Sequence, residues 1–220
     1  MAGTLPPLAF IGGTGPEGRG LALRLAAAGH PVILGSRDAA RAQASADELN
    51  AILGSNRAAG ATNVDASAQA AIAFLVVPYA GQAEALPSLA AALAGKVVIT
   101  AVVPLSFEGG RPSVLPVPEG SAAQQAALLL PASKLTAAYH HLSAKHLADL
   151  AHPMEGDVLV CTDDAEAKQT TMELTARIPD LRPIDAGGLA NANTVEAMTA
   201  LLLGINRRYK VSAGVRIVGV

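Results

Sequence analysis

Short apolar runs recur along the first part of the chain and alternate with alanine-rich segments whose apolar positions follow a helical spacing. Runs without polar alternation are typical of strands buried on both faces of a parallel sheet. Their alternation with helices predicts an α/β fold in which helices cover both faces of the sheet. The expected strands are 8–11, 32–34, 62–64, 71–77, 96–102 and 135–140, and the expected helices are 16–28, 38–53, 80–94 and 121–130.

The alternation of strands and helices is interrupted by a proline- and glycine-rich segment at 104–120, which predicts a surface loop. Further on, Asp163 and Asp164 precede a periodic segment and are expected to cap a helix. We divide the chain into a larger domain, 1–150, and a smaller C-terminal α/β part, 151–220. The elements expected beyond residue 150 are strands 157–161, 181–184 and 215–220, helices 165–178 and 191–209, and a turn at 185–188.

Three glycines follow the first expected strand in the order Gly13-x-Gly15-x-x-Gly18, and a helix is expected to begin at Pro16. In this pattern the first glycine forms the turn, the second lets backbone approach a pyrophosphate, and the third lets helix and strand pack closely. Gly29 is expected to end that helix. A glycine-rich turn without a ligand is the alternative, but the strand-turn-helix context favours a Rossmann-type, doubly wound sheet that binds a dinucleotide.

The end of the second expected strand indicates which dinucleotide is bound. NAD-binding folds usually place Asp or Glu there to hold the ribose 2′-OH, whereas this chain has Ser36 and Arg37, with Arg41 one helical turn further on. These side chains can hydrogen-bond a 2′-phosphate, so NADP is preferred over NAD. Arg37 as an ordinary surface cation is the alternative. Asp38 either pairs with Arg41 or caps the helix that follows.

Composition excludes several classes of protein. Hydrophobic residues make up 51% and charged residues 15% of the 220, which is enough apolar material for a substantial core. A net charge of -2, no Trp, three Tyr and three Phe argue against a nucleic-acid-binding surface. The single cysteine, Cys161, lies in an apolar run and is expected to be a core residue. The N-terminus lacks a secretory signal and the apolar runs are too short to span a bilayer, so we expect a cytoplasmic protein.

Together these motifs resemble a known family, the F420:NADP oxidoreductases, over nearly the whole chain. The front of the resemblance is Gly12-Gly13-Thr14-Gly15-x-x-Gly18 followed by Gly35-Ser36-Arg37. The more discriminating part comes late, in Asp157-Val158-x-Val160-Cys161-x-Asp163-Asp164 and in Leu181-Arg182-Pro183-x-Asp185-Ala186-Gly187-x-Leu189-x-Asn191.

The resemblance implies reversible hydride transfer between NADP(H) and the deazaflavin coenzyme F420, in a cleft between the Rossmann domain and the C-terminal part. No catalytic acid, nucleophile or metal is expected, because such a transfer needs only the correct placement of two rings. His140 matches a family histidine and is expected to orient a ring, whereas His141 and Ser143 replace a threonine and a proline of the family. The resemblance implies these coenzyme-binding residues: Gly13, Thr14, Gly15, Pro16, Glu17, Gly18, Ser36, Arg37, Arg41, Val77, Val103, His140, Leu142, Ala144, Ala186, Gly187 and Leu189.

Several readings stay open at this point. The turn at 185–188 is either a close approach of backbone to a ring or simply a tight turn. Arg207, Arg208 and Lys210 are either ligands for the anionic tail of F420 or, as we prefer, cations at a helix C-terminus. His146 and His152 fit no zinc-ligand spacing and are expected on a solvated helix and its loop.

Function and assembly also have alternatives. An NADPH-dependent reductase of a flavin, imine or ketone would share the front motifs, and so would an NADP-binding module without turnover. The apolar residues at 201–203 and 215–220 predict a homodimer through the C-terminal part.

Overall fold

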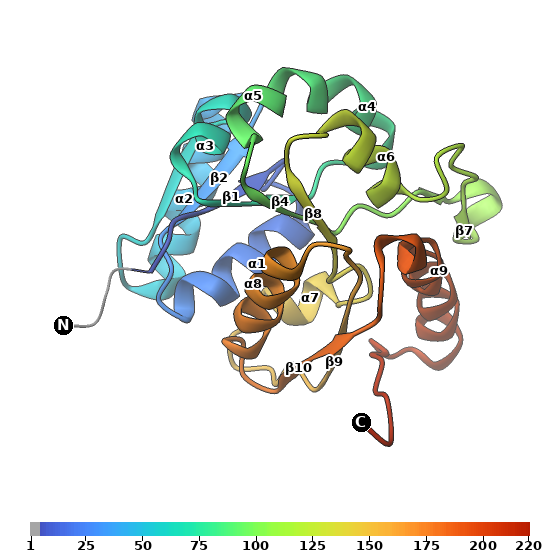
Figure 1. The fold of residues 1–220 in the computed structure, drawn as a ribbon. Helices are drawn as coiled ribbons and strands as arrows, with labels where there is room; N and C mark the ends of the chain where they lie inside the picture. Colours follow the sequence, from blue (N-terminus) through green and yellow to red (C-terminus); the bar gives the residue numbers. More distant parts are fainter. Residues whose placement is uncertain (1–4) are drawn as a thin grey trace.

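The computed structural model describes residues 5–220, and its centre is a sheet of six parallel strands (Figure 1). The strand order is β3-β2-β1-β4-β5-β8, so the chain winds outward from β1 first to one side and then to the other. This order confirms the predicted Rossmann-type fold and opens a crevice at the carboxyl ends of β1 and β4. The strands are β1 (Leu8–Ile11), β2 (Val32–Ser36), β3 (Ala58–Thr62), β4 (Ile72–Leu75), β5 (Val97–Thr100) and β8 (Lys134–Ala137).

Alternate side chains of each strand enter two separate apolar layers, one on each face of the sheet. On one face Phe10 stacks on Phe74 with ring centroids 4.6 Å apart, beneath α1, α2 and α8. On the other face Ile11 and Leu75 pack beneath α3, α5 and α6. The helices are α1 (Pro16–Ala27), α2 (Ala39–Leu53), α3 (Asn63–Gln69), α4 (Tyr79–Ala85), α5 (Ala90–Leu93), α6 (Ala122–Leu129), α7 (Ala144–Leu147), α8 (Ala165–Ala176) and α9 (Ala192–Tyr209).

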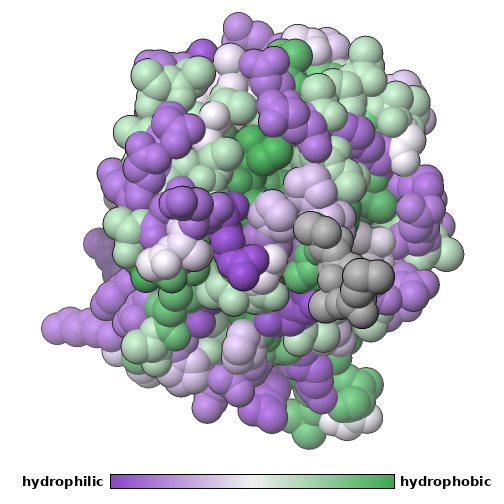
Figure 2. Space-filling model, turned by 90° about the vertical axis from the view of Figure 1, so that its left-hand side faces the viewer, coloured by the Kyte–Doolittle hydropathy of each residue, from purple (hydrophilic) through white to green (hydrophobic). Residues whose placement is uncertain are grey.

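The outer surface carries mixed polar and apolar side chains. Hydrophilic residues cover much of the face shown in Figure 2, and apolar residues lie in small groups between them. Among residues 5–220, no helix combines the length and the apolar character that crossing a membrane requires.

The C-terminal part contains a second sheet of two parallel strands, β9 (Gly156–Val160) and β10 (Leu181–Asp185), joined by α8. Its Val158 and Leu174 belong to the same apolar cluster as Phe10, so this part shares a core with the six-stranded sheet. Glu196 of α9 is 1% exposed and accepts the backbone N–H groups of Ala122 and Ala123, both at 2.9 Å. The buried carboxylate thereby joins α9 to the start of α6.

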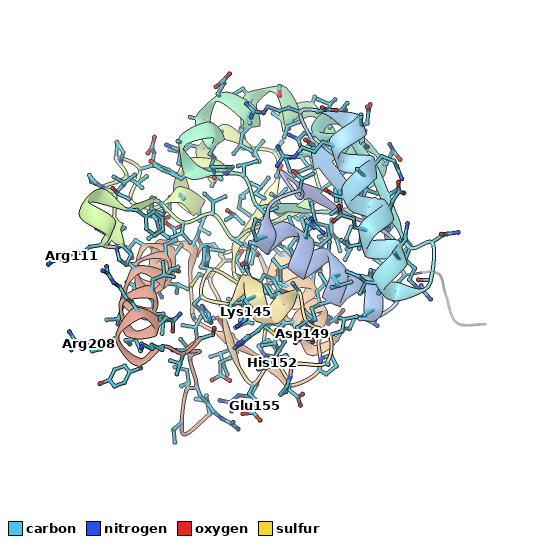
Figure 3. The ribbon with its side chains drawn as sticks, turned by 180° about the vertical axis from the view of Figure 1, so that it is seen from behind. Arg111, Lys145, Asp149, His152, Glu155 and Arg208 are labelled. Atoms are coloured by element: carbon cyan, nitrogen blue, oxygen red, sulfur yellow. The ribbon has the colours of Figure 1, made fainter. Side chains whose placement is uncertain are left out.

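Arg24 joins α1 to the segment around α7. It is 5% exposed, and its guanidinium donates to the backbone carbonyls of His146, Leu147, Asp149 and His152. Figure 3 shows Asp149 and His152 beside the helical turn of α7 that carries Lys145. The segment that follows β8 is thus fixed against the helix that begins at the glycine-rich turn.

Among the expected elements of the first domain, a strand and a helix before residue 95 are wrong in detail. The strand at 62–64 is wrong because β3 ends at Thr62, whose hydroxyl caps the next helix by accepting the N–H of Asp65. The helix at 80–94 is wrong because it is divided into α4, a 3₁₀ turn at Leu86–Leu89 and α5. Pro87 has no N–H to donate and therefore interrupts the α-helical hydrogen bonds.

The loop expected at 104–120 contains a short antiparallel pair, β6 (Leu105–Ser106) and β7 (Ser113–Val114).

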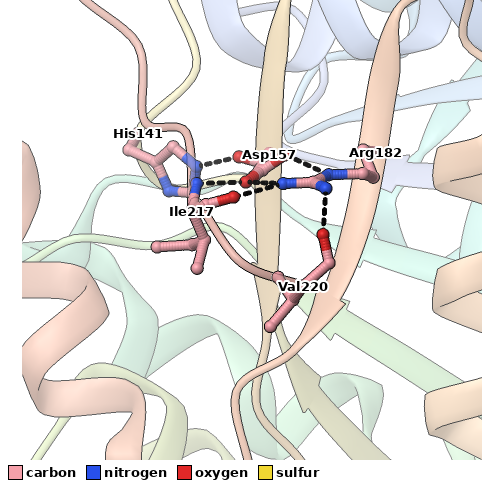
Figure 4. A network of polar contacts seen from close by, with 5 residues as sticks. All are labelled: His141, Asp157, Arg182, Ile217 and Val220. Atoms are coloured by element: carbon pink, nitrogen blue, oxygen red, sulfur yellow. Dashed lines mark hydrogen bonds and ion pairs between the residues drawn. The ribbon is translucent and has the colours of Figure 1, made fainter.

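The closing strand expected at 215–220 is also wrong, because side chains hold this segment in place of a strand ladder (Figure 4). Asp157 accepts the N–H of Ile217 at 2.5 Å and pairs with Arg182 through two bonds of 2.8 and 2.9 Å. Arg182 also donates to the carbonyls of Ile217 and Val220. The guanidinium and the N–H of Ile217 hold the pKa of Asp157 below its usual range. The C-terminal segment is therefore tied to both strands of the second sheet.

Candidate functional site

The glycine-rich turn connects β1 to α1, and its glycines have different surroundings. A Cβ on Gly13 would lie 2.6 Å from the carbonyl oxygen of Phe10, and one on Gly18 would lie 2.7 Å from Cα of Gly13. These contacts are too short for any side chain, so Gly13 and Gly18 are required for packing. A Cβ on Gly15 would meet only the carbonyl oxygen of Gly12, at 3.9 Å. Gly15 therefore leaves open space at the N-terminus of α1.

The end of β2 carries the residues expected to select NADP. The alternatives for Asp38 are decided here, because its carboxylate caps α2 by accepting the N–H groups of Ala40 and Arg41. Ser36 is buried and its hydroxyl accepts the N–H of Asp38, whereas Arg37 and Arg41 are exposed. The carboxylate of Asp38 is thus engaged by the helix, and the exposed guanidinium groups of Arg37 and Arg41, which line the cavity, can meet an anion.

A single cavity of ≈ 1210 Å³ connects these features with the C-terminal part. It exceeds the roughly 300–1,000 Å³ typical of a pocket for one small ligand. Most of the residues predicted as coenzyme contacts line it: Thr14, Gly15, Pro16, Glu17, Gly18, Ser36, Arg37, Arg41, Val77, Val103, His140, Leu142 and Ala144.

His140 lies in the segment after β8 and forms part of the cavity wall. The strand ends at Ala137, so the expectation that it continues to His140 is wrong. The imidazole is 5% exposed, and among the described residues neither ring nitrogen has a hydrogen-bond partner. Burial lowers the pKa of His140 to about 3, and the neighbouring His141 adds to the effect. The ring is therefore neutral near pH 7 and has one N–H to donate.

Comparison with known proteins identifies the family. A family model described as coenzyme F420-dependent NADP oxidoreductase matches residues 7–104. The F420-dependent NADP reductase of Methanothermobacter marburgensis is 39% identical over 217 residues, which cover 96% of this chain and 97% of that protein. The chain belongs to the F420-dependent NADP oxidoreductase family.

Two further similarities agree with this assignment. The F420-dependent NADP reductase of Methanothermobacter thermautotrophicus is 40% identical, over 96% of this chain and 94% of that protein. The crystal structure of an Arthrobacter sp. FB24 protein, provisionally described as an F420-dependent NADP reductase, superimposes with a TM-score of 0.84 at 25% identity. That superposition covers 98% of this chain and 100% of the other.

Four of the predicted coenzyme contacts, Gly13, Ala186, Gly187 and Leu189, are not among the residues that line the large cavity. Gly13 lies beneath the turn, against Phe10. Ala186 and Leu189 pack in an apolar cluster with buried Cys161. Gly187 lies in a tight turn, in which its N–H donates to the side chain of Asp185 at 2.9 Å. A direct ring contact for Ala186, Gly187 and Leu189 stays a prediction from the resemblance.

Sequence reasoning missed the cavity wall supplied by α9. Thr199, Leu202, Leu203 and Asn206 all line the cavity, and the hydroxyl of Thr199 donates to the carbonyl of His140 at 2.9 Å. The apolar run at 201–203 is expected to form a subunit contact, but of these three residues only Leu201 is strongly exposed, at 64%. The helical period of α9 is a signal that could have separated these positions, since Thr199, Leu202 and Leu203 share one face.

The remaining charged and metal-binding candidates lie elsewhere. The rings of His146 and His152 lie together, with centroids 3.7 Å apart, outside the large cavity. Within the part of the chain that the structure describes, no group of three His, Cys, Asp or Glu side chains is placed to hold a metal ion. Arg207 donates to the carbonyl of Gly110, and Figure 3 shows Arg208 projecting outward from α9. These cations do not line the cavity.

Proposed function

We propose that the cavity binds NADP(H) and coenzyme F420 together and that the protein transfers a hydride between them. The observation that carries this proposal is the continuity of one large cavity from the glycine-rich turn to His140 and α9. Membership of the F420-dependent NADP oxidoreductase family supports the identity of both coenzymes.

The residues present fit NADP(H). Gly15 leaves room for phosphate at the N-terminus of α1, where backbone N–H groups and the helix dipole favour an anion. Ser36, Arg37 and Arg41 lie where the fold places the adenosine ribose, and their donors suit a 2′-phosphate.

The rest of the cavity suits the meeting of two planar rings. When bound, the two coenzymes supply the carbons between which the hydride passes, since nicotinamide and deazaflavin both carry two electrons in this form. Val77, Val103 and Leu142 provide apolar walls that exclude water, and the neutral imidazole of His140 can donate an N–H to a ring carbonyl. The protein's task is then positioning, which needs no acid, base or nucleophile.

The decisive experiment is to mix the purified protein with NADPH and oxidised coenzyme F420 and to follow the loss of the deazaflavin's visible absorbance. We expect rapid bleaching with NADPH and little with NADH. If NADPH binds but the deazaflavin is not bleached, the proposal is contradicted, and flavin, imine and ketone acceptors are to be tested next. If none of these is reduced, the protein is an NADP-binding module without turnover.

Arg37→Ala is expected to raise the KM for NADPH about tenfold or more while changing the KM for NADH little, since a charge-assisted hydrogen bond contributes about 1.5–3 kcal/mol. Steady-state kinetics with both coenzymes measure this. Arg57→Ala is the matched control, because that guanidinium is exposed and donates to the carbonyl of Gly29, away from the cavity. Equal changes for the two coenzymes would show that Arg37 does not contact the 2′-phosphate.

We also propose a homodimer formed through the C-terminal part, as well as the cytoplasmic location expected from the sequence. Large apolar side chains are exposed there, among them Leu201 at 64%, Tyr209 at 68% and Val218 at 93%. Exposed apolar side chains that form a contiguous patch are typical of an interaction surface. Gel filtration with light scattering at micromolar concentration is expected to give twice the 22.1 kDa chain mass, and a monomer would contradict the proposal.

A further inference from the structure

Glu17 has an unusual position for an acidic residue. It is the second residue of α1, next to the open space at Gly15, and it lines the cavity. Its Oε1 atom is fully buried, and within residues 5–220 it has no hydrogen-bond partner. Buried polar atoms in native structures are nearly always paired, so this oxygen requires an explanation.

The ionisation of this carboxyl is controlled by burial. The side chain of Glu17 as a whole is half-buried, but its Oε1 atom lies away from water without a partner, which is costly for a carboxylate. This desolvation raises the pKa of Glu17 to about 8, with no contribution from a charged neighbour. Arg19, the nearest cation along the same helix, pairs with Glu48. The other titratable or charged side chains that face the cavity are Arg37, Arg41, Tyr79, Glu84, His140 and His141.

A negative charge at this point would oppose the binding of a phosphate group, although the same charge at a helix N-terminus without a ligand would be favourable. A neutral carboxylic acid has an O–H to donate and carries no charge that repels an anion. We propose that Glu17 binds NADP(H) as the neutral acid, with its O–H donating a hydrogen bond to a phosphate oxygen at the start of α1. This inference rests on the proposed function, because it requires that the dinucleotide occupies the glycine-rich turn.

The proposal predicts a specific dependence of affinity on pH. Well below a pKa of about 8 the free protein already holds the proton on Glu17, so this group adds little pH dependence to binding there. Above pH 8 the free carboxyl is ionised and must take up a proton when the coenzyme binds. The Kd for NADPH is therefore expected to rise about tenfold for each pH unit above this point.

The test is to titrate the wild-type protein, Glu17→Gln and Glu48→Gln with NADPH between pH 7.0 and 9.5 and to follow fluorescence or heat. Glutamine has nearly the shape of glutamic acid and keeps a donor but cannot ionise. We expect Glu48→Gln to bind NADPH with the affinity of the wild type at pH 7, and the Kd of Glu17→Gln at pH 7 is the reference for that variant's own pH dependence. The Kd of the wild type and of Glu48→Gln should then rise above pH 8, whereas that of Glu17→Gln stays constant. Glu48 is the control because it lies on α2, beside α1 but outside the cavity.

Two further measurements separate the inference from the proposed function. Calorimetry of the wild type at pH 9 in two buffers of different ionisation enthalpy should show uptake of nearly one proton on NADPH binding, and Glu17→Gln should show none. Without coenzyme, the wild type should lose thermal stability relative to Glu17→Gln as the pH rises from about 5 to 8, because the folded carboxyl keeps its proton above the unfolded pKa.

A wild-type Kd that is independent of pH up to 9.5, or a Gln variant with the same dependence as the wild type, would overturn the inference and leave the proposed function intact. Failure of the wild type to bind NADPH at pH 7 would overturn both.

Discussion

Replacing Gly15 by valine is expected to abolish the binding of NADPH while leaving the folded protein nearly as stable as before. Gly15 has φ −78° and ψ 165°, a conformation open to any residue. Its Cβ would meet only the carbonyl oxygen of Gly12, at 3.9 Å, and the two methyl groups would occupy the cavity at the N-terminus of α1. We expect the Kd for NADPH to rise about a hundredfold or more, which corresponds to about 2.7 kcal/mol.

Gly18→Val is the matched comparison for this experiment. Its Cβ would lie 2.7 Å from Cα of Gly13 and 2.8 Å from a methyl carbon of Val76, so β1 and α1 could not pack as they do. Thermal unfolding and NADPH titration together distinguish the two variants. Gly15→Val should lose binding with a change in stability near 1 kcal/mol or less, the cost of valine at an N-cap. Gly18→Val should lose stability first. Wild-type affinity in Gly15→Val would show that phosphate does not bind at this turn.

The sequence was sufficient to predict this part of the molecule because the constraints on it are local. The shortest approaches at Gly13 and Gly18 are to Phe10 and Gly13, which lie within the same strand-turn-helix unit, and only the further contacts to Leu34 and Val76 come from β2 and from the residue that follows β4. Pro16 marks the first turn of α1 and Ser36 ends β2, so each position can be read from its immediate neighbours. The parallel topology followed from the same information, since alternating strands and helices leave few other arrangements.

The opposite wall of the cavity could not be predicted in the same way. Thr199 meets His140 across 59 residues of sequence, and Ala213 reaches the cavity from the segment after α9. Which side of α9 faces inward depends on Glu196, whose carboxylate caps α6 more than 70 residues away. Such contacts are set by tertiary packing and leave no local motif.

The closing strand shows the other limit of local patterns. The apolar residues at 215–220 are typical of a strand, but the bonded backbone groups of Ile217 and Val220 meet the side chains of Asp157 and Arg182, while the carbonyl of Val215 accepts the backbone N–H of Asp157. The apolar pattern alone cannot distinguish a strand from an extended segment that side chains hold in place.

Arg24 connects α1, which the sequence predicts, to the segment around α7, whose packing the sequence does not predict. Its helix begins at the glycine-rich turn, and its guanidinium holds the segment that continues from His140 and Leu142 in the opposite wall. The two backbones are also close at Gly20, where a Cβ would lie 2.5 Å from Cβ of Leu147. The cavity therefore depends on this interface for the spacing between its walls.

Arg24→Met is accordingly expected to lower the free energy of unfolding by about 3 kcal/mol, since each hydrogen bond from a charged donor contributes about 1.5–3 kcal/mol and water replaces part of the loss at exposed carbonyls. For a chain of this size the melting temperature should fall by roughly 6–12 °C, and amide exchange should accelerate most in residues 146–152. Arg19→Met is the control on the same helix, because its pair with Glu48 is exposed and should contribute less than about 1 kcal/mol. Equal losses for the two variants would mean that solvent replaces the bonds of Arg24, and that packing at Gly20 alone holds the two walls of the cavity together.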